Sequence, residues 1–352
     1  MQIAMIKFNS QLLIEKAISV IKSIIMEPID RIRLHDLDQS VRHIHGPLSQ
    51  EISVNNDEAI VLCVVRNGQP LLKSFIEHYL KLGFKHIFFL DNGSTDGTID
   101  IIKSYQKTTL LLSEKPFRIY HAIFKNYLIK RFGQNRWCVI ADIDEFLYFP
   151  LKRSLIDILT YVNRYQYDAI AIQMLDMFSE EDIKLEKPNK VWTLDSLKSA
   201  FRYYDLNNLS EHRYARHLLS RPHPSLKFLT GGIRKTVFGL DSFLTKETMF
   251  FGRKETYLKS SHLLKSANIA DFSALFLHYK FINDFPTYTL KSVKEENHWK
   301  GSQEYKAYLG VLSKKEKLVL LQPSSFDLKD IDELIRQKFL CVSSQFRNFW
   351  LT

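Results

Sequence analysis

The chain has 352 residues, 45% of them hydrophobic, and a formal net charge of +10 at pH 7. This length and apolar content are enough to bury one large core. The cysteines, Cys63, Cys138 and Cys341, have no zinc or redox spacing, which excludes a zinc-bound or disulfide-stabilised scaffold and predicts small core residues in a reducing compartment.

Residues 1–57 are predicted to form an N-terminal helical extension and a connector. Apolar residues recur at helical spacing between residues 13 and 25, and Glu15, Lys16 and Lys22 interrupt them. These charges exclude a membrane span, and the segment has no small-residue cleavage site typical of a signal peptide. We expect an amphipathic helix that packs against the domain, with a helix at a membrane surface as the alternative.

Strands and helices alternate in the next part of the chain. A first apolar run is followed by a helical pattern that stops at Gly83, and a second run, at residues 86–90, breaks at an Asp-Asn-Gly turn with helix-capping residues. Repeated alternation predicts an α/β fold with a mainly parallel sheet and helices on both faces. The predicted strands are residues 59–65, 86–90, 109–113 and 137–144.

Polar side chains lie at the carboxyl ends of three of these predicted strands. They are Arg66, Asn67, Asp91, Asn92, Asp142 and Asp144. Ligands of such sheets bind beyond the carboxyl ends of the strands, so we expect these groups to converge at one edge.

Asp142 and Asp144 are separated by one residue at the end of the apolar run WCVIADIDEF. Alternate residues of extended chain point the same way, so both carboxylates can face one hard divalent cation, Mg²⁺ or Mn²⁺, with a phosphorylated substrate. The other explanation of an isolated D-x-D is a solvated turn after a strand.

The segment VVRNGQPLLKSFIEHYLKLGFKHIFFLDNGSTDGTIDII, followed by WCVIADIDEFLYF, resembles the nucleotide-sugar half of a family 2-like glycosyltransferase with the GT-A fold. The segments GGIRKTVFG and FLHYKFINDF are similar to the bacterial branch of that group, in which a D-x-D-E-F sequence ends a donor-site strand. The resemblance covers roughly residues 58–285. It departs from the family pattern at Gly68, where relatives commonly have an acidic residue.

The resemblance implies that Asp91 hydrogen-bonds the nucleotide, and that Asp142 and Asp144 bring Mn²⁺ or Mg²⁺ to the donor diphosphate. It also implies that His278 is a further metal ligand, although a histidine between apolar residues is commonly structural. The other candidate donor-binding residues are Arg66, Asn67, Asn92, Arg234 and Lys280.

An inverting transferase also needs a general base. A strand-like run at residues 168–175 is followed by Asp176, Glu180 and Glu181. Asp176 is the first choice because it lies nearest the strand end; the other two carboxylates can equally belong to an acidic surface.

Two other functional classes are compatible with parts of the sequence. A nucleotidyltransferase or a metal-dependent phosphohydrolase also uses carboxylates at strand ends, but the first loop lacks the glycine-rich, basic sequence usual in nucleotidyltransferases. The net positive charge raises the option of a nucleic-acid-binding protein. The lysines are scattered, however, and no recognition motif occurs, so we expect no nucleic-acid partner.

We therefore expect a GT-A glycosyltransferase domain at residues 58–285 and a C-terminal helical appendage at residues 286–352, which includes a helical pattern at residues 326–340. The expected donor is a UDP-sugar and the expected acceptor a glycan or a lipid-linked glycan of surface polysaccharide synthesis. The predicted location is the cytoplasm, and the basic surface is compatible with peripheral contact with an anionic membrane at its inner face.

Overall fold

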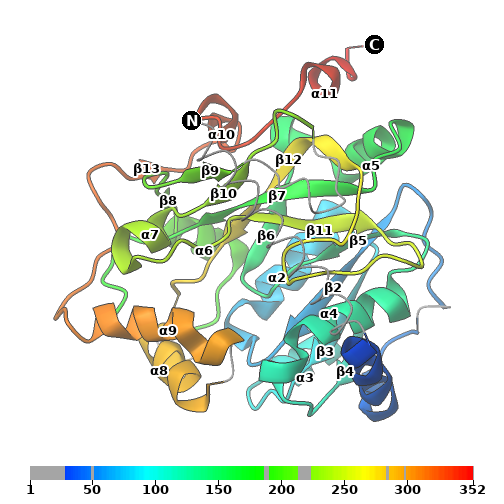
Figure 1. Cartoon of the computed structure of the whole chain (residues 1–352), viewed down its shortest axis with the longest axis horizontal. Coiled ribbons are helices and arrows are strands. Elements are labelled where there is room, and N and C mark those ends of the chain that lie inside the picture. Colours follow the sequence, from blue (N-terminus) through cyan, green and yellow to red (C-terminus); the bar gives the residue numbers. More distant parts are fainter. Residues whose placement is uncertain are drawn as a thin grey trace, which may run out of the picture.

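The computed structural model describes residues 28–48, 51–185, 190–212, 223–282, 285–296 and 299–351. A nine-stranded sheet runs through the molecule, with helices on both of its faces (Figure 1). The strand order is β1-β4-β3-β2-β5-β11-β7-β12-β6. These strands are β1 (Arg42–His45), β2 (Ala59–Val65), β3 (His86–Asp91), β4 (Thr108–Leu112), β5 (Trp137–Ile140), β6 (Glu145–Tyr148), β7 (Ala169–Asp176), β11 (Thr245–Phe251) and β12 (Ile269–His278).

The strands of the sheet run mostly in one direction. β2, β3, β4, β5, β7 and β12 point the same way, whereas β1, β6 and β11 are antiparallel to their neighbours. Short strands pair outside this sheet, β9 (Ser210–His212) with β10 (Phe228–Thr230) and β8 (Tyr203–Tyr204) with β13 (Phe326–Asp327). The predicted α/β fold with a mainly parallel sheet and helices on both faces is confirmed (Figure 1).

The sheet is buried on both faces, which explains why its strands have nearly continuous apolar sequences. In β2, Val61 and Cys63 belong to the core on one face, while Ile60 and Leu62 belong to the core on the other. Successive side chains of a strand point to opposite faces, so one strand contributes to two cores. Helices cover both.

The helix α2 (Gln69–Leu82) begins after β2 with a proline in its first turn and ends at Gly83, whose φ of 106° closes the helix in the left-handed conformation. Its Leu72 and Phe75 pack in one core, and Phe124 of α4 (Phe117–Phe132) packs in the other. The other helices before residue 282 are α3 (Thr98–Lys103), η2 (Pro150–Lys152), α5 (Leu155–Arg164), α6 (Leu194–Ala200) and α7 (Ile233–Phe238).

The N-terminal part is described from residue 28 on, and residues 28–40 are helical. Leu37 of this helix packs in the same core as α4. The helix predicted between residues 13 and 25 lies outside the described residues. None of the helices in the described part of the chain combines the length and the apolar character that a bilayer span requires.

The segment between β5 and β6 crosses the sheet. β5 lies in the middle of the strand order and β6 at its edge, with β11, β7 and β12 between them. Residues 141–144 connect the two strands. The Asp-x-Asp sequence therefore passes the carboxyl ends of β7 and β12 and the beginning of β11.

The C-terminal part is less separate than the sequence suggested. α8 (Phe285–Glu295) and α9 (Trp299–Leu312) lie side by side near α7 (Figure 1). Phe238, Phe281 and Tyr308 share one hydrophobic cluster, so the predicted boundary at residue 285 falls within a packed unit. The segment 326–340 forms turns, the two residues of β13 and the short α10 (Glu333–Arg336) rather than the predicted helix; α11 (Ser344–Asn348) follows.

Candidate active site

The last residues of β7 and β12 meet at the edge of the sheet. Asp176 and His278 are register partners on these two parallel strands, and His278 Nδ1 lies 2.5 Å from Asp176 Oδ1. β6 pairs with the other side of β12 and places Glu145 opposite His278. The backbone ladder therefore fixes an acid–histidine pair next to the crossing segment.

Asp176 also binds Arg234 of α7. Arg234 Nε donates to Asp176 Oδ2 at 2.7 Å and Nη2 donates to Oδ1 at 3.0 Å, which is a bidentate pair. Burial alone would raise the pKa of Asp176, but Arg234 and His278 together lower it below its ordinary value. Both oxygens are engaged and the side chain is only 3% exposed. This geometry suits a residue that orients His278 and does not suit a general base.

The other nitrogen of His278 faces the Asp-x-Asp segment. Its Nε2 lies 3.1 Å from Asp144 Oδ2. Burial lowers the pKa of His278, but the two neighbouring carboxylates outweigh burial and raise it to about 9. Arg234, Asp176, His278 and Asp144 thus form one continuous line of contacts, which we call the charged line.

The end of the charged line fits a divalent cation. Asp144, Glu145 and His278 each offer a ligand atom, and these atoms lie within 4.8 Å of one another. An octahedral ion with ligands at about 2.1 Å separates adjacent ligand atoms by about 3.0 Å. Asp144 Oδ2 and His278 Nε2 lie 3.1 Å apart, an ion-pair distance that also matches this separation once Nε2 has lost its proton. Two of the predicted metal ligands are therefore brought together in a suitable geometry.

Glu145 fits a structural role better than a ligand role. One of its oxygens contacts Lys246 Nζ, and the other accepts the backbone N–H of Asp142 at 3.1 Å. Burial raises the pKa of Glu145, although Lys246 opposes this. The carboxylate thus closes the turn between β5 and β6.

Asp142, the third predicted metal ligand, lies between two lysines. Lys125 Nζ of α4 is 2.8 Å from Asp142 Oδ1, and Lys246 Nζ of β11 is 3.5 Å from Oδ2. Burial would raise the pKa of Asp142, but the two lysines lower it below its ordinary value. Sequence reasoning missed both lysines. Both lysines lie within elements that are otherwise mostly buried, and a buried charged side chain usually needs a partner of opposite charge.

Asp91 and Asn92, predicted to bind the donor, have structural contacts. Asp91 is fully buried; its Oδ1 accepts the N–H groups of Gly93 and Ser94 at 3.0 and 2.9 Å, and the Ser94 hydroxyl donates to Oδ2. The Asn92 amide donates to the carbonyl oxygens of Ser113 and Lys115. The polar atoms of both residues therefore shape the turn after β3.

The turn after β3 is joined to the loop after β2. The Asn67 N–H donates to Ser94 Oγ and the Gly68 N–H donates to Thr98 Oγ1, both at 2.8 Å. In return, the Thr95 N–H donates to Asn67 Oδ1 at 2.8 Å. The two loops form one hydrogen-bonded unit at the carboxyl ends of β2 and β3. Arg66, the residue before Asn67, has a partly exposed guanidinium whose Nη1 lies 3.9 Å from Glu295 Oε2 on α8.

A second charge cluster lies where α9 meets the charged line. Glu304 Oε1 is 3.5 Å from Lys280 Nζ and 3.6 Å from Arg234 Nη1, and Tyr308 donates a hydrogen bond to the same oxygen at 2.5 Å. Lys280 also lies over the rings of Tyr305 and Tyr308. The predicted donor-binding residues Arg234 and Lys280 are thus brought together by Glu304. Sequence reasoning missed Glu304 because it assigned α9 to a separate appendage.

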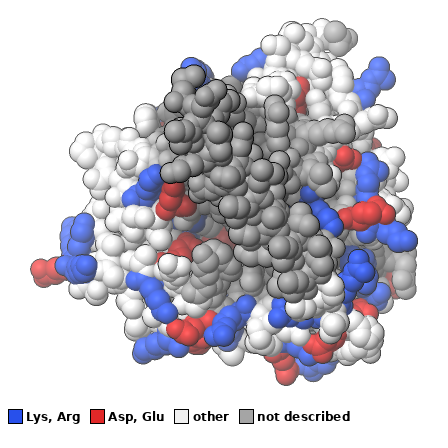
Figure 2. Space-filling view, in the orientation of Figure 1, with Lys and Arg blue, Asp and Glu red and all other residues white. Residues whose placement is uncertain are grey.

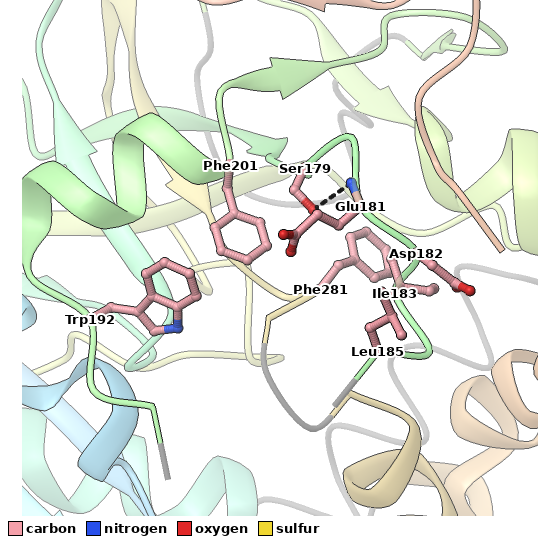
Figure 3. Close-up of a pocket in the computed structure, with 8 residues that line it drawn as sticks. All are labelled: Ser179, Glu181, Asp182, Ile183, Leu185, Trp192, Phe201 and Phe281. Carbon is pink, nitrogen blue, oxygen red and sulfur yellow. Dashed lines mark hydrogen bonds between the residues drawn. The ribbon is translucent and has the colours of Figure 1, made fainter. Parts of the chain in front are cut away.

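Glu180 and Glu181, the other candidate bases, are exposed and do not belong to the charged line. The Tyr203 hydroxyl lies 3.4 Å from Glu180 Oε2. Glu181 lines a hollow of about 20 Å³, and Figure 3 shows its carboxylate on the side where Phe201 and Trp192 lie. This hollow has room for about one water molecule.

The surface charge is mixed where the drawn face is described. Figure 2 shows Lys and Arg side chains interspersed with Asp and Glu around this face. The net charge of +10 is therefore not gathered into one basic area in the described part of that face.

Three solved structures resemble parts of the chain at low similarity. S. aureus TarS 1-349 is 17% identical with a TM-score of 0.30, and the match covers 38% of this chain and 43% of that chain. Glucosyl-3-phosphoglycerate synthase from Mycobacterium tuberculosis, in complex with Mn²⁺, uridine diphosphate and phosphoglyceric acid, is 15% identical with a TM-score of 0.24 and a coverage of 34% of this chain and 43% of that chain. HddC from Yersinia pseudotuberculosis is 12% identical with a TM-score of 0.23 and a coverage of 37% of this chain and 62% of that chain.

Two plant proteins are similar in sequence over a shorter stretch. A glycosyltransferase family 92 protein of Arabidopsis thaliana is 28% identical over 122 residues, which are 33% of this chain and 21% of that protein. One of Oryza sativa subsp. japonica is 26% identical over 102 residues, or 28% of this chain and 18% of that protein. The matched part thus spans about a fifth of the length of these relatives.

The family comparison covers much more of the chain. Residues 60–308, well over half of the sequence, match the family model of glycosyltransferase family 92. The predicted enzyme class is confirmed, and a nucleotidyltransferase or a phosphohydrolase is not supported; the bacterial family 2-like branch stays a prediction. The chain belongs to glycosyltransferase family 92.

Proposed function

We propose that the protein transfers a sugar, with inversion, from a UDP-sugar to a glycan or lipid-linked acceptor and that it uses Mn²⁺ or Mg²⁺. The observation that carries this proposal is the 3.1 Å separation of Asp144 Oδ2 and His278 Nε2 at the carboxyl edge of the sheet. Both are suitable ligands, and Asp176 holds His278 in place through its other ring nitrogen.

The residues around this pair suit a diphosphate. A bound divalent ion would neutralise the charge that develops on the nucleoside diphosphate as the sugar leaves. Lys280 and Arg234 place two further positive charges beside the charged line. Asp142, held by its two lysines, fixes the beginning of the crossing segment and thereby the position of Asp144.

The nucleoside is assigned to the joined loops after β2 and β3. Arg66, Asn67, Asp91 and Asn92 all belong to this unit, which lies at the carboxyl edge of the sheet. Asp91 and Asn92 would act mainly by holding the loop backbone in shape, and Arg66 has the exposed side chain of the set. A role in surface polysaccharide synthesis, in the cytoplasm or at the inner face of a membrane, remains the sequence-based proposal.

A ligand panel tests the proposed function. Thermal unfolding is followed with UDP, GDP and a set of UDP-sugars, each with Mn²⁺, with Mg²⁺ and with a chelator. A ligand at about 100 times its dissociation constant adds about 2.7 kcal/mol to the stability of the folded state, so the UDP compounds should raise Tm, mostly in the presence of metal. A folded protein that shows no shift with any nucleoside diphosphate and metal would refute the proposal.

Product analysis then identifies the reaction. Incubation with the stabilising UDP-sugar and a glycan acceptor should yield a new glycoside and free UDP. Release of a sugar phosphate without a glycoside would instead indicate phosphohydrolase chemistry.

A further inference from the structure

The proposed inverting transfer requires a base with a free oxygen near the donor site, and most carboxylates there are already engaged. Asp176 and Glu145 are almost completely buried, and both oxygens of each accept contacts from the protein. Asp144 faces His278, and Asp142 is held by lysines. These four have structural or metal-binding roles.

Glu304 of α9 differs from the buried Asp176 and Glu145 because its side chain is 39% exposed. It differs from the similarly exposed Asp142 because it lies beside Arg234 and Lys280 and is not held between two buried lysines. Among the described residues, the hydrogen bond of its carboxylate comes from the Tyr308 hydroxyl to Oε1, which is also the oxygen nearer to Lys280 and Arg234. Oε2 accepts no hydrogen bond from the described residues. A carboxylate fixed through one oxygen can accept a hydroxyl group at the other.

The helix that carries Glu304 is firmly positioned. Tyr308 is buried, and its ring meets those of Phe238 and Phe285 edge to face at centroid distances of 4.8 and 5.3 Å. Tyr308 lies one helical turn after Glu304, so its hydroxyl also fixes the rotamer of the glutamate. Precise placement of this kind is what a general base requires.

Glu304 is also connected with the donor site. Arg234 bridges Glu304 and Asp176, and Asp176 in turn holds His278. Lys280, two residues after His278, contacts Glu304 directly. The carboxylate therefore lies beside the cations proposed to meet the donor diphosphate.

We propose that Glu304 is the general base of the transfer, a step that rests on the proposed function. The acceptor hydroxyl oxygen forms a bond to the anomeric carbon, and its proton moves to Glu304 Oε2. The bond between the anomeric carbon and the diphosphate oxygen breaks at the same time, and its electron pair leaves with the nucleoside diphosphate. One proton and one electron pair are thereby accounted for without another reactant.

The surrounding charges keep Glu304 ionised but weaken it as a base before the donor binds. Burial would raise the pKa of Glu304, but Lys280, Arg234 and the Tyr308 hydroxyl outweigh burial and a small opposing effect of Asp176, and lower it to about 2. The carboxylate is therefore ionised at neutral pH. When a donor diphosphate binds beside the same two cations, its negative charge offsets theirs and increases the proton affinity of Glu304.

The test is Glu304→Gln, which keeps an oxygen for the Tyr308 hydroxyl but cannot take a proton. Thermal shifts with UDP and Mn²⁺ should match the wild type. UDP release from UDP-glucose, UDP-galactose and UDP-N-acetylglucosamine, with methyl glycosides of the common hexoses as acceptors, should fall by about 10² to 10⁴-fold. The matched control is Glu296→Gln, which removes a surface carboxylate paired with Lys306 and should retain the wild-type rate.

The outcomes separate this proposal from a structural role. A Glu304→Gln rate within a few-fold of the wild type, or a loss of UDP–Mn²⁺ binding in that variant, would overturn it. If the glutamine variant is unstable, Glu304→Asp keeps the charge but withdraws the oxygens by one methylene, and it should bind UDP normally with a reduced kcat. An unchanged kcat would again overturn the proposal. Absence of a UDP–Mn²⁺ shift in the wild type refutes the proposed function itself.

Discussion

His278 and Asp176 are register partners on two parallel strands, and His278 Nδ1 also lies 2.5 Å from Asp176 Oδ1. The orientation of the histidine therefore depends on the hydrogen-bonded sheet and not on a loop. Arg234 completes this arrangement from α7.

Removal of the two proposed metal ligands should affect ligand binding more than folding. Asp144→Asn and His278→Ala should each abolish the metal-dependent part of the UDP-induced Tm shift. The measurement is the Tm difference between Mn²⁺ and chelator at fixed UDP. Asp195→Asn, an exposed carboxylate on α6, is the control and should respond like the wild type. A full Mn²⁺ effect in both site variants would exclude this pair as the metal site.

Asp142 should behave differently from Asp144. Asp142→Ala leaves Lys125 and Lys246, both largely buried, without this counter-charge. Allowing for the partial exposure of Asp142, we expect a loss of about 2 kcal/mol in the free energy of unfolding. Denaturant unfolding should show a much smaller loss for Asp144→Ala. Equal losses would mean that the lysine contacts of Asp142 add no stability.

Asp176→Asn should lower both stability and metal affinity. The variant loses the bidentate pair with Arg234, and breaking a buried ion pair costs about 3 kcal/mol or more. It also weakens the partner of His278 Nδ1, and loss of such support lowers metal affinity by about 10 to 100-fold. Calorimetric titration with Mn²⁺ measures the second effect. Unchanged Mn²⁺ affinity in the folded variant would show that His278 needs no support.

The free energy of unfolding should decrease as the pH rises, because of Glu247 in β11. Its Oε2 accepts the Leu264 N–H, Oε1 has no hydrogen-bond partner among the described residues, and burial raises the pKa to about 7. The ordinary value is 4.5, so between these two values the folded state binds more protons than the unfolded state. The free energy of unfolding should therefore decrease as pH rises from about 4.5 to 7, by up to about 3 kcal/mol in total.

Glu247→Gln should flatten this pH dependence and stabilise the protein at pH 8. Denaturant unfolding at pH 5 and pH 8 measures it. An unchanged difference between these pH values in the variant would assign the effect to other groups.

The paired glycines before α7 should control the position of Arg234. Gly231 has a φ of 102°, and an added Cβ would lie 2.2 Å from the Asn208 carbonyl oxygen. Gly231→Ala should therefore cost more than the roughly 1 kcal/mol of left-handed strain alone, and it should shift Arg234. Gly239→Ala, also at positive φ but with open space around it, is the control. Equal Tm losses in the two variants would contradict the steric argument.

The first half of the fold could be predicted from the sequence because its signals are local. The strand predicted at residues 59–65 is β2 with the same bounds, and the helix after it ends at Gly83 as expected. Each unit consists of a strand, a turn with glycine or capping residues, and a helix, so neighbours in sequence decide its structure.

The second half depended on partners distant in sequence. In the sequence, nothing near Lys246 indicates a special role; in the structure, β11 places it against Glu145 and Asp142. The capping residues and apolar spacing before residue 340 predicted a helix, but tertiary packing of Leu334 and Phe339 in the main core left only one helical turn. Glu304 was overlooked for the same reason, since its cationic partners Arg234 and Lys280 lie far from it in sequence.

The position of β6 at the edge of the sheet has a consequence for synthesis. In the described sheet β6 pairs with β12 alone, so residues 145–148 have no strand to join until residues 275–278 have left the ribosome. The Asp-x-Asp segment is made well before β12 but is held at both ends only after β12 has also been made. Such long-range pairing is slow to form. Nascent chains that end before β12 should therefore expose β6 as an unpaired edge open to aggregation, and the candidate active site should form only after β12 has been made.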